Sequence, residues 1–186
     1  MRRLVDEPAL RRFMRTLGAE AERDVRLYFT GGATAVLLGW RGSTVDVDIK
    51  IDPETDRLFR ALPRLKETLS INIELASPDH FIPELPGWQE RSLFVAREGR
   101  LSFYHYDLYA QALSKVQRGH TQDLADVRQM IGRGLVDPAG LLQRFTEIEP
   151  RLYRYPAIDG ASFRRAVEEM ARPEGDSGAA GAGSET

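Results

Sequence analysis

The chain has 186 residues and a net charge of −2, from 26 Lys and Arg against 28 Asp and Glu. This length can bury a sizeable core, and the near-neutral charge excludes a protein that coats nucleic acid by bulk positive charge. The absence of cysteine excludes disulfides, thiolate zinc sites and cysteine nucleophiles. No apolar run approaches the roughly 18 residues that span a bilayer, and no signal peptide is visible, so we expect a cytoplasmic protein without membrane partners.

The first half of the chain alternates between helical and extended patterns of apolar residues. Spacing, turn residues and capping residues define the expected elements. In chain order these are an amphipathic helix over 7–23, a strand over 25–30, a helix over 33–38, a strand over 44–51, a helix opened by Asp52 and Pro53 and running to about 69, a strand over 70–76, and a hairpin of strands 92–96 and 101–106.

The second half is helical in pattern, and the last residues contain no large apolar side chain. We expect helices at about 107–117, 122–132, 138–149 and 160–171. The fold class is α+β, with a small mixed sheet and a helical C-terminal subdomain. Residues 1–106 form the core with its N-terminal helix, 107–172 the helical part of the same unit, and 173–186 a disordered tail.

Two carboxylates stand out on the strand over 44–51. Asp46 and Asp48 are two residues apart, so they share one face of the strand, about 7 Å apart along it. Because like charges held this way repel, a divalent cation would relieve the conflict, and hard oxygen ligands suit Mg²⁺. An Asp-x-Asp pair by itself is more often a solvated strand edge. The pair therefore predicts a metal site only together with a second signal.

That second signal is the pair Gly31-Gly32 at the end of the preceding strand. Glycines where a strand enters a helix permit close backbone approach and offer unpaired N–H groups to an anion such as a triphosphate. Taken alone, the pair is commonly just a turn. Carboxylates for a metal and amides for phosphates are the two parts that nucleotidyl transfer needs, because its catalysis is mostly positioning and charge neutralisation.

The order Gly-Gly, short helix, Asp-x-Asp resembles the signature of the DNA polymerase β-like nucleotidyltransferase superfamily. The context from Phe29 to Asp48, followed by Lys115 and Asp126, is similar to the AbiEii/MenT toxin group of bacterial proteins, DUF6036-like chains included; the likeness covers about 25–132. It implies a minimal nucleotidyltransferase fold and Mg²⁺-dependent transfer of a nucleoside monophosphate from an NTP, with one or two metal ions. For the MenT toxins it also implies tRNA 3′ ends as acceptor and a cognate antitoxin as partner.

The resemblance assigns residues position by position. The resemblance implies that Asp46 and Asp48 hold the metal and act in catalysis. It places Lys115 and Asp126 in the active site. The residues that it assigns to nucleotide binding are Gly31, Gly32, Thr44 and Lys115. In other superfamily members a later strand supplies a third acid that acts as base. Glu74 is the candidate, although a solvated residue on that strand is an equal alternative. Otherwise Asp126 supplies the acid, or the site has only two carboxylates.

A regulatory role is predicted for the residues just before Asp46. In some MenT-like systems the antitoxin phosphorylates a Ser or Thr there, and Thr44, or secondarily Ser43, is the matching residue. A phosphate would add about −1.5 to −2 charges beside the metal pair and interfere with the cation or the triphosphate. An intact mass unchanged by co-expression with the antitoxin would contradict this prediction.

Three functions remain open on the sequence alone. The leading one is an EC 2.7.7-type nucleotidyltransferase acting on tRNA as the toxin of a toxin–antitoxin pair. The arginines at 97, 100, 118, 128 and 133 could track an RNA backbone or form a solvated face. The alternatives are transfer to a small molecule or protein side chain, and a non-catalytic nucleotide-binding protein of the same fold. The identity of the NTP, the acceptor and the oligomeric state are left open.

Overall fold

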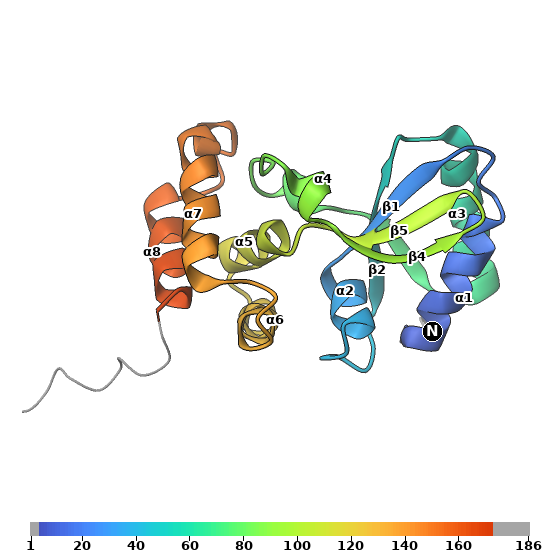
Figure 1. Cartoon of the computed structure of the whole chain (residues 1–186), viewed down its shortest axis with the longest axis horizontal. Coiled ribbons are helices and arrows are strands. Elements are labelled where there is room, and N and C mark those ends of the chain that lie inside the picture. The colour runs from blue at the N-terminus through green and yellow to red at the C-terminus, as the bar shows by residue number, and fades with distance from the viewer. Residues whose placement is uncertain (1–3, 173–186) are drawn as a thin grey trace, which may run out of the picture.

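The computed structural model describes residues 4–172, so the predicted tail at 173–186 lies outside the described residues. Within them the chain forms eight α-helices, two 3₁₀ turns and one five-stranded mixed sheet (Figure 1). The elements are α1 (Glu7–Gly18), β1 (Val25–Thr30), α2 (Gly31–Leu37), β2 (Asp46–Asp52), α3 (Asp56–Leu69), β3 (Asn72–Leu75), η1 (Pro78–His80), α4 (Trp88–Arg91), β4 (Leu93–Glu98), β5 (Leu101–His105), α5 (Leu108–Arg118), α6 (Thr121–Gly132), α7 (Pro138–Ile148), η2 (Glu149–Arg154) and α8 (Gly160–Met170).

The sheet has the strand order β3-β2-β1-β5-β4. Strand β1 pairs antiparallel with β2 and parallel with β5, and β2 pairs parallel with β3. The predicted α+β class with a small mixed sheet is therefore confirmed. The order places β2 between β1 and β3, so residues of β1 and β3 flank those of β2 in the sheet.

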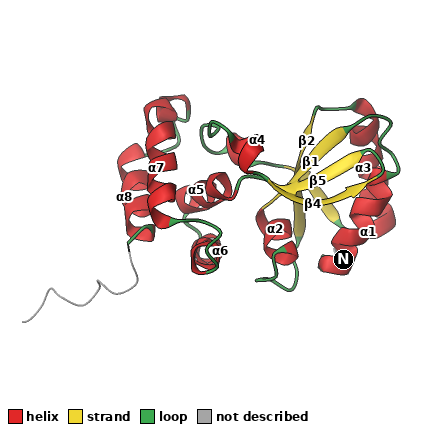
Figure 2. Ribbon diagram, in the orientation of Figure 1, coloured by secondary structure: helices red, strands yellow, loops and turns green. Residues whose placement is uncertain are grey.

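One face of the sheet is covered by α1 and α3 (Figure 2). Helix α1 starts where the Asp6 carboxylate accepts a hydrogen bond from the Ala9 N–H, a side-chain N-cap. Its apolar stripe packs with inward-facing strand residues such as Phe29 and Ile49 in one core. Burial of this apolar surface fixes the register of β2, so its polar residues face the other side.

The C-terminal helices build a second core at the other end of the molecule (Figure 2). Helix α5 contacts α6, α7 and α8, and the Asp107 carboxylate caps its first turn by accepting from the Tyr109 N–H. The polypeptide enters α5 directly from β5. Helix α5 therefore joins the sheet to the helical half, and the boundary drawn at residues 106 and 107 stays a prediction.

Several predicted boundaries are corrected by the structure. Helix α1 ends at Gly18 rather than at 23. The N-cap of α3 is Thr55, whose hydroxyl accepts from the Leu58 N–H, and not Asp52, because Asp52 is still the last residue of β2. Strand β2 starts at Asp46, while Thr44 forms an isolated bridge with Val5. The short helix α4 and the turn η2 were not predicted. Their sequences carry weak periodicity, and tertiary contacts decide their shape.

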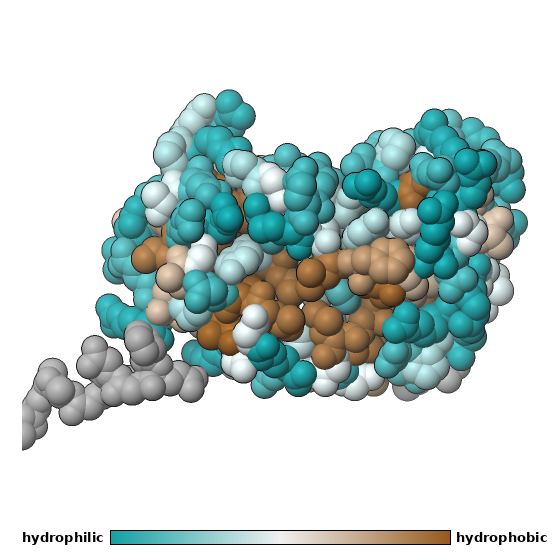
Figure 3. Space-filling model, viewed as in Figure 1, coloured by the Kyte–Doolittle hydropathy of each residue, from teal (hydrophilic) through white to brown (hydrophobic). Residues whose placement is uncertain are grey.

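Hydrophobic side chains gather in a band across the face seen in Figure 3, over β4 and beside α2. Leu93 and Phe94 on β4 are exposed large apolar residues, and Phe94 is 62% exposed. None of the helices in the described range 4–172 is both long and apolar enough to span a membrane.

Candidate active site

Strand β2 places Asp46 and Asp48 on one face of the sheet. Its burial alternates, with Val47, Ile49 and Ile51 buried in the core and the aspartates facing away from it. The register pairs Asp48 with Thr30 on β1 and with Glu74 on β3. The sequence could not reveal this register, which sets Glu74 beside Asp48 although 26 positions separate them.

The three carboxylates form the acidic wall of the site: Asp46, Asp48 and Glu74. Burial, followed by the negative charges of Glu74 and Asp46, raises the pKa of Asp48 to about 6. The Asn72 amide donates to Asp46 Oδ1 at 2.7 Å and to Glu74 Oε1 at 2.8 Å, which holds these two side chains toward each other. The wall thus concentrates negative charge. Asn72 orients two of the carboxylates but does not neutralise them, because its amide carries no charge.

Helix α5 faces the acidic wall across a pocket. Its residues Gln111, Ser114, Lys115 and Arg118 recur at helical spacing and line that pocket together. Lys115 is only 4% exposed. Its ammonium donates to Asp123 Oδ1 at 3.0 Å and to Asp126 Oδ2 at 2.7 Å. Since an ammonium has three N–H donors, one donor remains for a ligand in the pocket.

The predicted active-site residue Asp126 lies behind Lys115 rather than beside the metal pair. It is 1% exposed, and its oxygens accept hydrogen bonds from Lys115, from the Trp40 indole N–H at 3.1 Å and from the Arg41 guanidinium. It does not line the pockets formed by the acidic wall. Asp126 thus contacts Lys115 and Arg41, whereas Glu74 is the acid that the register sets next to Asp48. An active-site role for Asp126 stays a prediction.

The two glycines are the first residues of α2 rather than a turn ahead of it. Gly31 has a φ of +58°, and a Cβ built there would lie 2.7 Å from Asp48 Oδ2. Only glycine meets both conditions without strain. A Cβ on Gly32 would overlap the Thr44 hydroxyl. The pair therefore lets the start of α2 approach the acidic wall and the loop before β2.

Gln111 is a buried residue of the site that the sequence analysis missed. Its Oε1 accepts from the Gly31 N–H at 3.0 Å, and its Nε2 donates to the Tyr106 carbonyl at 2.8 Å and to Thr34 Oγ1 at 3.1 Å. The Gly31 N–H, which we expected to be unpaired for an anion, is thus occupied by Gln111. The only available signal was a polar residue four positions before Lys115 on the same helix face.

Two pockets open on either side of the aspartates. Both are lined by Gly31, Asp46, Asp48, Lys115 and Arg118. The first, called here the Glu74 pocket, has a volume of about 200 Å³ and adds Glu74, Ser77 and Phe81 to its lining. The second, the Arg41 pocket, has about 410 Å³ and adds Gly32, Arg41, Ser43 and Thr44. Glu74 therefore lines only the first pocket, whereas Arg41 and Asp123 line only the second.

The predicted regulatory residues lie on the wall of the Arg41 pocket. Thr44 is 9% exposed, and its hydroxyl donates to the Asp46 carbonyl at 3.0 Å. Ser43 is half-buried. Phosphorylation at either position stays a prediction.

The donor set suits a hard cation. The acidic wall offers oxygen ligands, and a bound cation would relieve the repulsion from Glu74 and Asp46 that, together with burial, raises the pKa of Asp48. In the described part of the chain, no group of three or more His, Asp or Glu side chains is already gathered as a metal site. Asp46 and Asp48 are the residues that would hold a cation here, with the remaining positions left to substrate and water.

Comparison with known families matches residues 9–168 to the family model described as a nucleotidyltransferase of unknown function, DUF6036. This match spans most of the chain, including every residue of the Glu74 pocket. Comparison with curated proteins and with solved structures gave no match. The AbiEii/MenT subgroup stays a prediction, whereas the wider assignment is confirmed: the chain belongs to the DUF6036 nucleotidyltransferase family.

Proposed function

We propose that this protein transfers a nucleoside monophosphate from an NTP to the hydroxyl of a tRNA 3′ end, with Mg²⁺ as cofactor. In this proposal it acts in the cytoplasm as the toxin of a toxin–antitoxin pair, and a cognate antitoxin restrains it. The observation that carries the proposal is the meeting of Asp46, Asp48 and Glu74 opposite Lys115 and Arg118. The likeness to the toxin group supports the acceptor and the biological role.

Each wall has a separate task in this reaction. Asp46 and Asp48 would hold Mg²⁺, which supplies neutralisation of the triphosphate charge when bound. The free donor of Lys115 and the Arg118 guanidinium bind phosphate oxygens from the opposite side of the pocket. The larger volume of the Arg41 pocket, about 410 Å³, and the start of α2 at Gly32 in its lining favour the triphosphate on that side.

Glu74 favours the acceptor on the other side. It is exposed, it lines the Glu74 pocket, and it is the register partner of Asp48. An acceptor hydroxyl there gives its proton to a Glu74 carboxylate oxygen while its oxygen attacks the α-phosphorus. The bond from the α-phosphorus to the bridging oxygen breaks, and pyrophosphate leaves with that electron pair. One new phosphoester replaces one phosphoanhydride bond.

Labelled substrate provides the direct test. Purified protein is incubated with each α-³²P-labelled NTP, Mg²⁺ and total bacterial tRNA, and the products are separated on a denaturing gel. We expect label on tRNA with the wild-type chain and a loss of about 100-fold or more in Asp46→Ala, because several kcal/mol of transition-state stabilisation depend on the metal.

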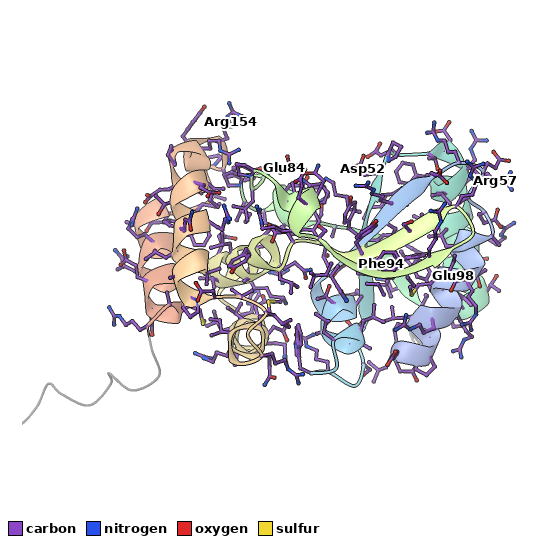
Figure 4. All side chains as sticks on the ribbon, viewed as in Figure 1. Asp52, Arg57, Glu84, Phe94, Glu98 and Arg154 are labelled. Atoms are coloured by element: carbon purple, nitrogen blue, oxygen red, sulfur yellow. The ribbon has the colours of Figure 1, made fainter. Side chains whose placement is uncertain are left out.

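Asp52→Ala is the matched control. Asp52 lies on the same strand, at its other end, and outside both pockets (Figure 4). The substitution Asp52→Ala removes the same charge and should leave transfer activity intact. An undiminished rate in Asp46→Ala would contradict the mechanism. Label on a small molecule or on protein, with none on tRNA, would keep the transferase and reject the tRNA acceptor, and NTP binding without any transfer would favour a non-catalytic binding protein.

A further inference from the structure

Phe81 is an aromatic residue of the Glu74 pocket to which the mechanism assigns no task. It is 38% exposed, although it lines a pocket whose other side carries the carboxylates. The Arg118 guanidinium lies over its ring, 5.6 Å from the centroid. A flat apolar surface paired with a flat cation is thus held at the site where the acceptor enters.

The segment that carries Phe81 is braced by contacts to both halves of the molecule. Phe81 follows η1, where the Asp79 carboxylate accepts from Lys50 Nζ at 2.8 Å and from the Ser77 hydroxyl. Tyr155, from the helical half, donates to the Asp79 carbonyl at 3.0 Å. These bonds from β2 and from the segment after η2 fix the turn that ends at Phe81.

The size of the Glu74 pocket limits what can enter it. Its volume of about 200 Å³ is below the range of about 300 to 1,000 Å³ that encloses a typical small ligand. A sugar hydroxyl can reach Glu74 and Asp48, whereas a complete nucleotide cannot be enclosed. The larger part of the acceptor must therefore remain outside, next to the exposed ring of Phe81.

We propose that the exposed ring of Phe81, over which the Arg118 guanidinium lies, is a binding platform for the terminal nucleobase of the acceptor. This inference rests on the proposed function, because it assumes that the acceptor hydroxyl enters the Glu74 pocket. A base stacks on an aromatic face irrespective of its hydrogen-bonding pattern. Phe81 lines the Glu74 pocket but not the Arg41 pocket, so it is assigned to the acceptor rather than to the NTP.

Phe81→Ala and Phe81→Leu test the platform by kinetics. We expect the KM for a short single-stranded RNA acceptor to rise about 5- to 100-fold in both variants, which is the effect of losing one stacked base. The kcat and the KM for NTP should change much less, because Arg118 keeps its ion pair with Asp123. Phe94→Ala is the control, because Phe94 is an even more exposed phenylalanine on β4 outside both pockets (Figure 4).

Phe81→Trp gives a readout that does not depend on catalysis. We expect a single-stranded RNA trinucleotide to quench the added indole fluorescence, relative to the wild-type signal, and a trinucleotide with an abasic 3′ end to quench it much less. Quenching by free nucleoside at similar concentration would identify a small-molecule acceptor of the same base chemistry.

The outcomes separate this inference from the transfer reaction. RNA labelling that is unaffected by Phe81→Ala would overturn the platform and leave the transferase intact. A rise in the KM for NTP alone would also overturn it, because the ring would then bind the donor base. Base-dependent quenching without any labelling would support the platform while the transfer reaction fails.

Discussion

The two walls of the site differ in how their charges are balanced. In the acidic wall, Asp48 receives no side-chain hydrogen bond from residues 4–172, and its neighbours are Asp46 and Glu74. In the wall opposite, Lys115 is bound by Asp123 and Asp126, and each of these acids has a further arginine partner. One wall carries like charges side by side, and the other is an ion-pair network that forms before any ligand arrives and leaves one Lys115 donor free.

The difference indicates which part of the site is preorganised. Burial opposes ionisation of Asp123, but Lys115 and Arg118 outweigh it and lower its pKa. On Asp48, burial and the charges of Glu74 and Asp46 outweigh the opposing charges of Arg118 and Lys115, and its pKa rises. The basic wall therefore has a fixed geometry that can select phosphates, while the acidic wall gains stability only when positive charge enters it.

The largest expected effect comes from removing the cation at the centre of the basic wall. Lys115→Met leaves the buried Asp123 and Asp126 with arginine partners only. Breaking a buried ion-pair network from one side costs about 3 to 5 kcal/mol in the free energy of unfolding. Urea denaturation of the purified variant measures this loss, and the transfer assay should show little remaining activity.

Lys66→Met is the control for that substitution. Lys66 is half-buried on α3 and has no ion pair within the described range 4–172. The substitution Lys66→Met removes the same charge and should change the free energy of unfolding by less than about 0.5 kcal/mol. A Lys115→Met variant as stable as the control would mean that the ion pairs of Lys115 contribute little to folding. The proposed difference between the two walls would then be wrong.

The sequence predicted the fold well where burial repeats regularly. Alternating apolar residues identified β2, and helical spacing identified α5 to α8, because these patterns report which face of an element is covered. The prediction was wrong at the start of α3. Asp52 and Pro53 favoured a helix that begins there, whereas the N-cap of α3 is Thr55. The sequence also failed to predict α4, a single turn buried through Trp88, since one residue carries no periodicity.

The site was predictable only where its parts are neighbours along the chain. Asp46 and Asp48 share a strand, so their common face follows from alternation. The proximity of Glu74 depends on the β2–β3 register, and the bond from the Gly31 N–H to Gln111 joins residues 80 positions apart. The role of Asp126 could not be resolved, because local spacing does not reveal that Trp40 and Arg41 reach it from another loop.

The acidic wall gives a pH-dependent effect of intermediate size. The folded pKa of Asp48, about 6, exceeds its ordinary value of 3.8, so the folded state binds this proton more tightly. Stability is fully present below pH 4 and is lost as pH rises through 6. Without divalent cations we expect the wild-type free energy of unfolding to fall by about 1 to 3 kcal/mol from this group, after allowance for partial solvent exposure.

Asp48→Asn should remove that loss, because the amide has the same shape and no charge. Urea denaturation in EDTA at pH 4.5 and 7.5 measures the difference between the two proteins. The variant should be more stable than wild type at pH 7.5 and inactive in transfer. Asp52→Asn, at the other end of β2, should follow the wild-type profile. Equal pH profiles for wild type and Asp48→Asn would contradict the uncompensated acidic wall.

The smallest effect on stability is expected at Gly31, which connects the two walls. The substitution Gly31→Ala should nevertheless abolish transfer activity. The Gly31 N–H is held by Gln111 of α5, and its Cα faces Asp48. Gly31→Ala and Gly134→Ala both place a side chain at positive φ, +58° and +69°, and each should cost about 1 to 2 kcal/mol. A Cβ at Gly134 has nothing within 4 Å, whereas one at Gly31 meets Asp48 Oδ2.

Equal stability losses measured by urea denaturation, with transfer activity lost only in Gly31→Ala, would show that the start of α2 must touch the acidic wall. Equal activities would mean that this close approach has no role in the reaction.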